Sequence, residues 1–326
     1  MTWSTSTTSS PDKENKLKHA IEDAEKNMGE NEIRDAWKNL NVFYGEIGDE
    51  SRYLETFPKV YELTSGALLK CDLLFSQALF ALKYDDFTLA EKAVTRAVSF
   101  LEQGSLDFEH KNRLMIFRAV LLTKSRQISQ AAQFFLDSVQ SFMSNDIITF
   151  EEFIRYVILT SPLILSRPLL KSQVLDSPEV LSVVHHSTVA KSYHFLQCLY
   201  STNYSESLTS LSEVLSILQT SDKFLSSHTN WLFRELRLVC LKQHLWAYVS
   251  VKLSSMADLF GVSEAILESD LRRFIVAGRL SCSIDEHAGI VYTDSANSRS
   301  DQGSVVRNID GLLAKMQVLS RSLAVV

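Results

Sequence analysis

Histidine is a common metal ligand, and three histidines of this sequence lie close together in the chain. They are His185, His186 and His194. On a helix, His186 and His194 could share a face, but adjacent histidines point about 100° apart, which suits shared ligation poorly. We identify no Cys or carboxylate that completes a ligand set beside them. The sequence therefore predicts no metal site.

The patterns typical of catalytic sites are missing from the sequence. It contains no HExxH motif, no Walker loop and no GxGxxG motif. Paired carboxylates occur at Asp85-Asp86 and at Glu151-Glu152, but both pairs fall at expected helix starts, where negative charge favours the helix dipole. We expect these pairs to cap helices. Ser, His and Asp are all present without a motif that marks a nucleophile, so we expect neither enzymatic activity nor a cofactor.

Composition favours a helical, intracellular protein. The 326 residues have a formal net charge of −6 and contain only 10 Gly and 5 Pro, the two residues that most often interrupt helices. Cys71, Cys198, Cys240 and Cys282 are far apart and form no CxxC pair, so we expect reduced thiols. The sequence has no apolar run of about 18 residues, so we expect no membrane span. The polar start, MTWSTSTTSSPDKENK, has no apolar core typical of a secretion signal.

Apolar residues recur about every 3.6 positions from residue 52 to residue 250, which predicts helices joined by short turns. Helical patterns with mixed charge precede them over residues 12–47. The expected helices are 52–65, 67–83, 87–102, 107–123, 128–143, 149–160, 166–172, 178–185, 188–200, 204–219 and 224–249.

A weak repeat supports stacking of these helices. In it, a small residue follows a large one after three positions, which lets two antiparallel helices approach closely. This pattern predicts a mostly α fold with a TPR-like α-solenoid of helical hairpins, although ordinary hairpin packing accounts for it about as well. The pairs are Phe87 with Ala90, Ile128 with Ala131, and Tyr204 with Ser207.

The stretch MADLFGVSEAILESDLRRFIVAGRLSCSID, residues 256–285, has the order of a winged helix-turn-helix module. It reads as a short helix, a longer helix and a strand, with Gly261 and Gly278 ending the helices. VSVKLSS (249–255) predicts an earlier strand, and Ser254 and Ser255 are expected to cap the first helix. RLSCSID and GIVYTD predict a hairpin.

The charges of this module argue against DNA reading. Phosphate contacts need cations on the second helix and the wing. That helix instead begins with Glu264, Glu268 and Asp270, and Arg272 and Arg273 come late. The hairpin tip, IDEHAG, is also acidic. We expect no nucleic acid and no membrane among the partners.

A last helix follows the polar linker DSANSRSDQGS (294–304). Its apolar residues step by four and three positions, which is a heptad pattern that needs a partner. Packing on its own domain is one interpretation, and a bundle with helices of other chains is the one we favour. The predicted interface residues are Val305, Ile309, Leu312, Met316, Leu319 and Leu323.

A helical-repeat array that runs into an acidic winged helix and a terminal helix resembles the PCI-domain family. These proteins are scaffold subunits of the proteasome lid, the COP9 signalosome and the translation initiation factor three complex. Lid subunits are the most similar, through the stretches KNRLMIFRAVLLTKSRQISQAAQFFLDSVQSF (111–142), SRPLLKSQVL (166–175), WLFRELRLVCLKQ (231–243) and LLAKMQVLSRSL (312–323), besides the winged-helix stretch itself.

The sequence patterns and the resemblance together predict a domain order: a disordered lead-in (1–15), a helical-repeat arm (16–185), a PCI domain (186–293), the linker (294–304) and the bundle helix (305–326). Within the PCI domain, the helical part would be 186–248 and the winged helix 249–293. The family's modules pack edge to edge, so a wing-edge interface is expected from Leu280, Cys282, Ile284, Ile290 and Tyr292.

The resemblance also implies a non-catalytic scaffold subunit of the 26S proteasome lid, in cytoplasm and nucleus. Its partners would be other PCI subunits of the lid, the lid deubiquitinase subunit and the ATPase base, in a hetero-oligomer. The alternatives are a scaffold subunit of the COP9 signalosome or of an initiation factor complex and, from a different class, a winged-helix factor that binds nucleic acid.

Overall fold

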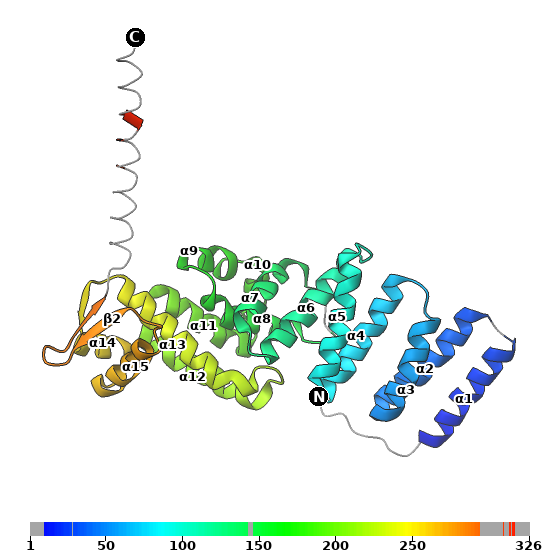
Figure 1. Ribbon diagram of the computed structural model, residues 1–326. Coiled ribbons are helices and arrows are strands. Elements are labelled where there is room, and N and C mark those ends of the chain that lie inside the picture. The colour runs from blue at the N-terminus through cyan, green and yellow to red at the C-terminus, as the bar shows by residue number, and fades with distance from the viewer. Residues whose placement is uncertain are drawn as a thin grey trace, which may run out of the picture. The chain divides into compact units, whose positions relative to one another are not determined.

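The computed structural model describes residues 10–27, 29–142 and 146–293, together with Ile309, Leu313, Lys315 and Met316. The chain divides into two compact units, Met1–Thr160 and Ser161–Val326. Helices dominate both units, and the described part has one small sheet (Figure 1). Among the described residues, no helix has both the length and the apolar character needed to cross a membrane.

The first unit is a series of helical hairpins in which helices adjacent in sequence pack together. For example, Tyr53 of the third helix stacks on Phe80 of the fourth helix, with the ring centroids 3.9 Å apart. The elements are α1 (Ser10–Asn27), α2 (Glu30–Ile47), α3 (Glu50–Leu63), α4 (Ala67–Lys83), α5 (Phe87–Glu102), α6 (Phe108–Lys124), α7 (Ile128–Asp137), η1 (Val139–Ser141) and α8 (Phe150–Thr160).

The small residues of the weak repeat allow this packing. Ala90 and Ala131 are completely buried, as is Ser207 in the second unit. The Ser207 hydroxyl donates a hydrogen bond to the backbone carbonyl of Phe195 on the preceding helix, at 3.3 Å. The predicted close approach of paired helices is therefore confirmed, and with it a helical solenoid followed by a winged helix.

Carboxylates cap helices of the first unit, as the paired acidic residues predicted. The Asp86 carboxylate accepts a hydrogen bond from the backbone N–H of Leu89 at the start of α5. Before α8, the Glu152 carboxylate accepts from the N–H of Thr149, whose hydroxyl accepts from the N–H of Glu152. This reciprocal arrangement is a capping box, which satisfies backbone donors that have no partner inside the helix.

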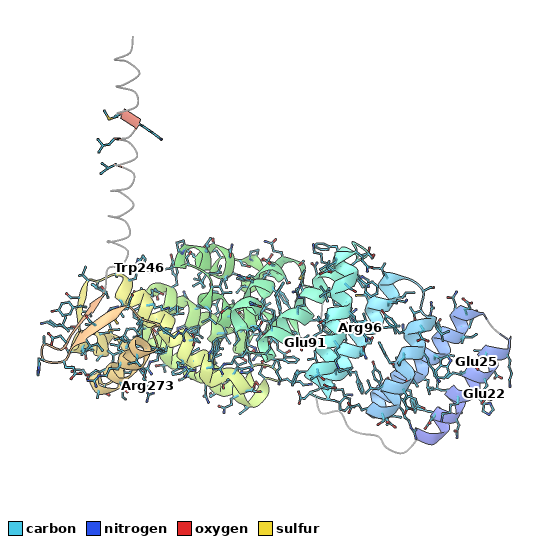
Figure 2. All side chains as sticks on the ribbon, viewed as in Figure 1. Glu22, Glu25, Glu91, Arg96, Trp246 and Arg273 are labelled. Carbon is cyan, nitrogen blue, oxygen red and sulfur yellow. The ribbon has the colours of Figure 1, made fainter. Side chains whose placement is uncertain are left out.

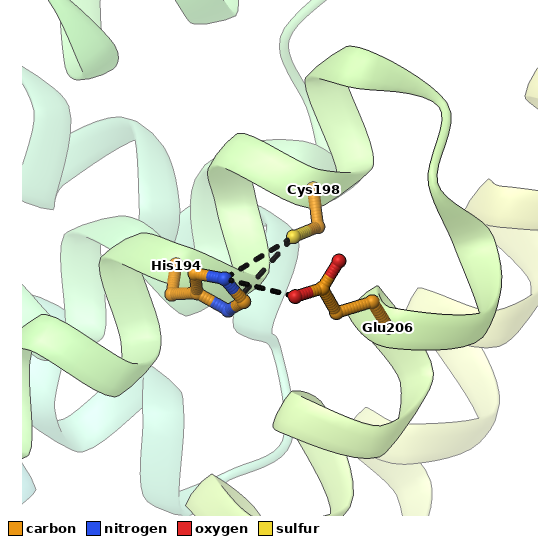
Figure 3. Close-up of side chains that lie close together, drawn as sticks. All are labelled: His194, Cys198 and Glu206. Carbon is orange, nitrogen blue, oxygen red and sulfur yellow. Dashed lines mark hydrogen bonds and ion pairs between the residues drawn. The ribbon is translucent and has the colours of Figure 1, made fainter.

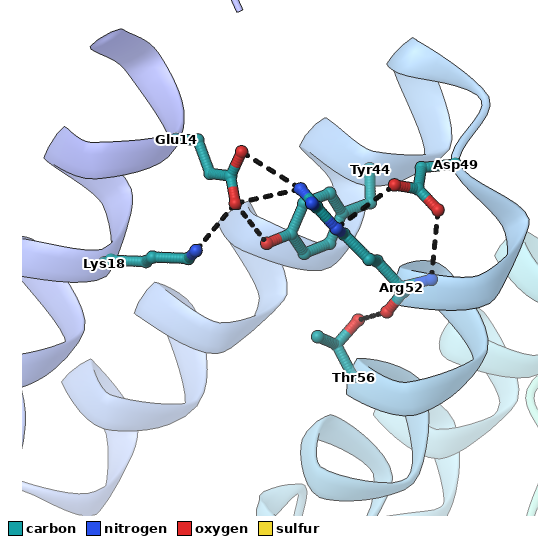
Figure 4. Close-up of polar contacts among 6 residues, drawn as sticks. All are labelled: Glu14, Lys18, Tyr44, Asp49, Arg52 and Thr56. Atoms are coloured by element: carbon teal, nitrogen blue, oxygen red, sulfur yellow. Dashed lines mark hydrogen bonds and ion pairs between the residues drawn. The ribbon is translucent and has the colours of Figure 1, made fainter. Parts of the chain in front are cut away.

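The Glu14 carboxylate connects the first three helices (Figure 4). It accepts hydrogen bonds from the Tyr44 hydroxyl of α2 at 3.2 Å and from the Arg52 guanidinium of α3 at 3.0 Å. Lys18, one turn along α1, lies 2.7 Å from the same carboxylate. The hydrogen bond from Lys18 is the largest of the contacts that lower the pKa of Glu14.

The second unit begins with short helical turns and continues with three long helices. Helix α11 packs on α12, and α12 packs on α13 and α14. The elements are η2 (Ser161–Leu163), α9 (Arg167–Leu170), η3 (Lys171–Leu175), α10 (Pro178–Val183), α11 (Ser187–Ser201), α12 (Tyr204–Ser221), η4 (Ser226–His228), α13 (Thr229–Trp246), β1 (Ser250–Lys252), α14 (Leu253–Phe260), α15 (Glu264–Val276), β2 (Cys282–Asp285) and β3 (Ile290–Thr293).

The three strands form an antiparallel sheet in the order β1-β3-β2. Tyr292 of β3 lies opposite both Ser250 of β1 and Ser283 of β2. The last strand in sequence is therefore central, and β1 and β2 are the edges. Together with α14 and α15, these strands make the winged helix-turn-helix that the sequence predicts.

Some local predictions are wrong. Helix α14 begins at Leu253 with Lys252 at its N-cap, so Ser254 and Ser255 are not caps. The helix expected over 128–143 ends at Asp137, and the one expected over 224–249 begins at Thr229.

The expected domain bounds remain predictions. Helix α1 starts at Ser10, inside the segment expected to be a disordered lead-in. The compact units meet at residues 160 and 161, which lie within the expected repeat arm.

Candidate protein-docking surface

An aromatic cluster joins the winged helix to the helices before it. Tyr204 of α12 stacks on Phe260 of α14, with ring centroids 4.8 Å apart and planes within 3°. His244 of α13 meets both rings edge-on. Gly261, which follows Phe260, has a φ of +64°, and a Cβ at this position would lie 2.6 Å from the Ser205 hydroxyl oxygen. Glycine is therefore required both by the left-handed turn and by the close approach of α12.

Two ion pairs hold the second wing helix against α13. Arg279, just after α15, makes two parallel hydrogen bonds to the buried carboxylate of Glu235. Arg237 pairs with Asp270 of α15, and both side chains are largely buried. Bidentate pairing fixes direction as well as distance. These two ion pairs therefore fix the position of α15, and of the segment that leads into β2, relative to α13.

The surface of α15 is poorly suited to phosphate. Arg272 already contacts two carboxylates, Glu268 one turn earlier and Glu286 at the hairpin tip. Asp285 accepts hydrogen bonds from the backbone N–H groups of His287 and Ala288, so the tip is built around a carboxylate. Cations that are engaged with carboxylates are not available to replace the counterions of a nucleic acid.

The sheet register separates the predicted wing-edge residues into two faces. Side chains alternate along a strand, so opposite partners share a face. Cys282 and Ile284 of β2 face inward with the fully buried Val291. Ile290 and Tyr292 of β3 lie on the opposite face, where Tyr292 is 44% exposed.

These five residues therefore do not share one strand edge, and their interface role stays a prediction. Leu280 and Cys282 are buried in the described fold and contribute to its core. Ile290 and Tyr292 belong to the central strand, not to an edge. The edge strands of the sheet are β1 and β2, and backbone groups on the outer side of an edge strand can pair with a strand from another chain.

Apolar side chains are exposed where α13 runs into the sheet. Trp246 is 79% exposed at the end of α13 (Figure 2), and Val249 is 72% exposed just before β1. The Thr293 hydroxyl donates a hydrogen bond to the Tyr248 carbonyl at 2.7 Å, which places this segment beside the end of β3. Aromatic residues at an exposed surface are typical of protein interfaces. We call Trp246, Tyr248 and Tyr292, which are all exposed aromatic side chains, the wing surface.

The predicted C-terminal interface is described only in part. Ile309 and Met316 are helical, and their side chains are 50% and 66% exposed. Val305, Leu312, Leu319 and Leu323 lie outside the described residues. The interface role of this segment stays a prediction.

Sequence reasoning missed one side-chain cluster. His194 and Cys198 are one turn apart on α11, and Glu206 of α12 lies beside them (Figure 3). The sequence reasoning therefore overlooked a Cys and a carboxylate that lie beside His194. The four-residue spacing of His194 and Cys198 was a usable signal, but Glu206 joins them only because α11 packs on α12.

Family models match both parts of the chain. The model of the 26S proteasome subunit RPN7 matches residues 2–173. The PCI domain model matches residues 217–295, which include all of α13, the complete winged helix and its three-stranded sheet.

Curated relatives extend over most of the chain. The 26S proteasome non-ATPase regulatory subunit 6 of Dictyostelium discoideum is 34% identical over 94% of this chain and 79% of its own length. The 26S proteasome regulatory subunit RPN7 of Saccharomyces cerevisiae is 32% identical over 93% of this chain and 72% of its own length. The COP9 signalosome complex subunit 1 of Arabidopsis thaliana is 26% identical over 87% of this chain and 64% of its own length.

Proposed function

Because this chain belongs to the family of the 26S proteasome subunit RPN7, we propose that it is a non-catalytic scaffold subunit of the proteasome lid. It would be the subunit that lid nomenclature numbers seven. In that role it supports ubiquitin-dependent protein degradation by holding other subunits in place. The match of the RPN7 model to residues 2–173, together with relatives that match 94% of the chain, carries this proposal.

The winged helix supplies a surface for this scaffold role. Its sheet has edge strands at β1 and β2, and its wing surface offers aromatic side chains beside that sheet. Strand addition satisfies edge backbone groups, and aromatic anchors supply apolar burial. We propose that PCI modules of other lid subunits dock here. The lid deubiquitinase subunit and the ATPase base are further proposed partners, reached within the same hetero-oligomer in cytoplasm and nucleus.

The names of the relatives describe regulatory subunits, which agrees with a role without catalysis. The sequence offers no motif that marks a nucleophile, a phosphate loop or a dinucleotide site. The buried cysteines also argue against a catalytic role. Burial raises the pKa of the Cys71 and Cys240 thiols to about 12, so neither is a ready nucleophile.

A scaffold subunit of the COP9 signalosome is the second candidate. The observation in its favour is the similarity to COP9 signalosome complex subunit 1. That similarity is lower in identity and in coverage than the similarity to the proteasome subunits. A nucleic-acid-binding role conflicts with the pairing of Arg272 to two carboxylates.

Incorporation of variants into the lid tests the docking surface. Tyr292→Lys places a charge on the wing surface without touching the core, so we expect a folded chain that enters the lid poorly. Gln219→Lys, a charge on the exposed face of α12, is the matched control and should enter normally. Equal incorporation of both variants would remove the wing surface from the proposal.

The terminal segment needs a separate variant. Deletion of residues 305–326 should leave a folded monomer that no longer enters the lid, because the expected bundle helix is lost. Thermal unfolding of the monomer serves as the control for folding. Normal entry of the deleted chain would contradict the bundle role and leave the wing surface unaffected.

A further inference from the structure

A cluster of three potential metal ligands lies on α11 and α12, outside the wing surface. Its members are His194, Cys198 and Glu206, and their ligand atoms all lie within 4.8 Å of one another. From this geometry we infer that the three side chains bind a divalent transition metal ion of the zinc class. The remaining coordination position would be open to solvent.

The distances at the histidine suit a tetrahedral ion. The His194 Nε2 atom lies 3.7 Å from the Cys198 sulfur and 3.4 Å from the Glu206 Oε1 atom. Ordinary zinc bond lengths place nitrogen and sulfur ligands about 3.5 Å apart and nitrogen and oxygen ligands about 3.3 Å apart around a tetrahedral ion. Small side-chain rotations would therefore bring the three atoms into coordination.

Two supporting hydrogen bonds already orient these ligands. The second ring nitrogen of His194, Nδ1, lies 3.1 Å from the Ser210 hydroxyl. When Nδ1–H donates to that hydroxyl, Nε2 carries the free lone pair that a metal needs. The Asn203 amide donates to the Glu206 Oε2 atom, which leaves Oε1 directed at His194. Supporting bonds of this kind are a regular feature of metal sites.

Access and protonation are both compatible with binding. The side chains of His194 and Glu206 are 46% and 52% exposed, so an ion can enter from solvent, while the Cys198 side chain is buried beneath them. A metal ion that binds the Cys198 sulfur displaces the thiol proton to solvent, and the sulfur ligates as a thiolate.

Cobalt(II) is the probe for the test, because its binding to a thiolate produces a sulfur-to-metal charge-transfer absorption. The full chain is stripped with a chelator, titrated with Co²⁺ and then titrated with Zn²⁺. We expect one Co²⁺ per chain, with the charge-transfer absorption, and its displacement by one equivalent of Zn²⁺. Absence of that absorption would overturn the inference.

Variants assign the ligands. His194→Gln, Glu206→Gln and Cys198→Ser should each weaken Co²⁺ binding at least about tenfold, the loss typical when a mere supporting residue is removed. His185→Gln alters an exposed histidine outside the cluster and should bind as the wild type does. Because His194 and Glu206 are exposed, their variants remain informative if Cys198→Ser fails to fold. Unchanged binding in both, or an equal loss in His185→Gln, contradicts the site.

Discussion

Arg279 and Glu235 form a bidentate ion pair across 44 residues of sequence, and this pair fastens the end of the wing helix to the middle of α13. The Glu235 side chain is only 8% exposed, whereas that of Arg279 is 41% exposed. The partly exposed Arg279 side chain therefore pairs with a carboxylate that is buried in the fold. The hydrogen bond to Glu235 is the largest cause that raises the pKa of Arg279.

Removal of this arginine should destabilise the second unit. Arg279→Ala leaves the Glu235 carboxylate buried without its partner, and we expect a loss of about 2 kcal/mol in the free energy of unfolding. Arg273→Ala changes an exposed arginine near the end of α15 and should stay within about 0.5 kcal/mol of the wild type. Urea unfolding measures both. Equal stability of the two variants would show that the ion pair does not anchor the wing.

Glu14 should determine how firmly α1 is held. Glu14→Gln weakens its contacts with Arg52, Lys18 and Tyr44, so amide hydrogens of α1 should exchange faster, with a global loss of about 1 kcal/mol or less. Glu22→Gln changes a more exposed carboxylate of the same helix and is the control. Hydrogen exchange resolved by mass spectrometry makes the comparison. Identical exchange in the two variants contradicts the role of Glu14.

His244 should make the second unit sensitive to mild acid. Burial lowers the pKa of His244, and its Nε2 atom has no hydrogen-bond partner among the described residues. The folded chain therefore takes up this proton less readily than the unfolded chain. The resulting stability is complete above the ordinary histidine pKa of about 6.5 and decreases as the pH falls below it.

The measurement is urea unfolding at several pH values between about 7.5 and 5.5, where most carboxylates stay ionised. His244→Phe keeps an aromatic ring against Tyr204 and Phe260 but cannot be protonated, so it should show a smaller loss of stability on acidification. His287→Gln, at the exposed hairpin tip, should follow the wild type. A wild-type stability that does not decrease over this range would refute the prediction.

Ser210 should act on the proposed metal site only through His194. Ser210→Ala removes the hydroxyl beside Nδ1, so we expect Co²⁺ binding to weaken about tenfold. The charge-transfer absorption should keep its position, because the three ligands remain. Ser216→Ala, an exposed serine of the same helix, is the control. A lost absorption band would show that the thiolate no longer ligates, which contradicts a purely supporting role for Ser210, and unchanged affinity would leave Ser210 without a role.

Local sequence patterns were sufficient for much of the fold. The helices 67–83 and 87–102 were predicted with the bounds observed, because long apolar periodicity and nearby turn residues define both ends. Gly261 was expected to end its helix and does so with a positive φ. These features depend on residues within one or two turns of each other.

Features that depend on tertiary contacts were not predicted. The N–H of Leu253 donates a hydrogen bond to the Gly289 carbonyl of the hairpin. Helix α14 therefore starts directly after β1, and Ser254 and Ser255 lie inside the helix, where they are not caps. The two faces of the sheet follow from the register of β3 between its neighbours, which no alternation within one strand reveals. Glu206 joins His194 and Cys198 only through the packing of two helices.

The central proposal is that this chain is a subunit of the proteasome lid, and the direct measurement is the composition of the complex that contains it. The full chain, tagged at its N-terminus and expressed at native level, is purified from its own cells and analysed by quantitative mass spectrometry. We predict recovery of the other lid subunits and the ATPase base in near-equal amounts. Recovery of signalosome subunits without proteasome ATPases, or of the chain alone, would contradict the proposal.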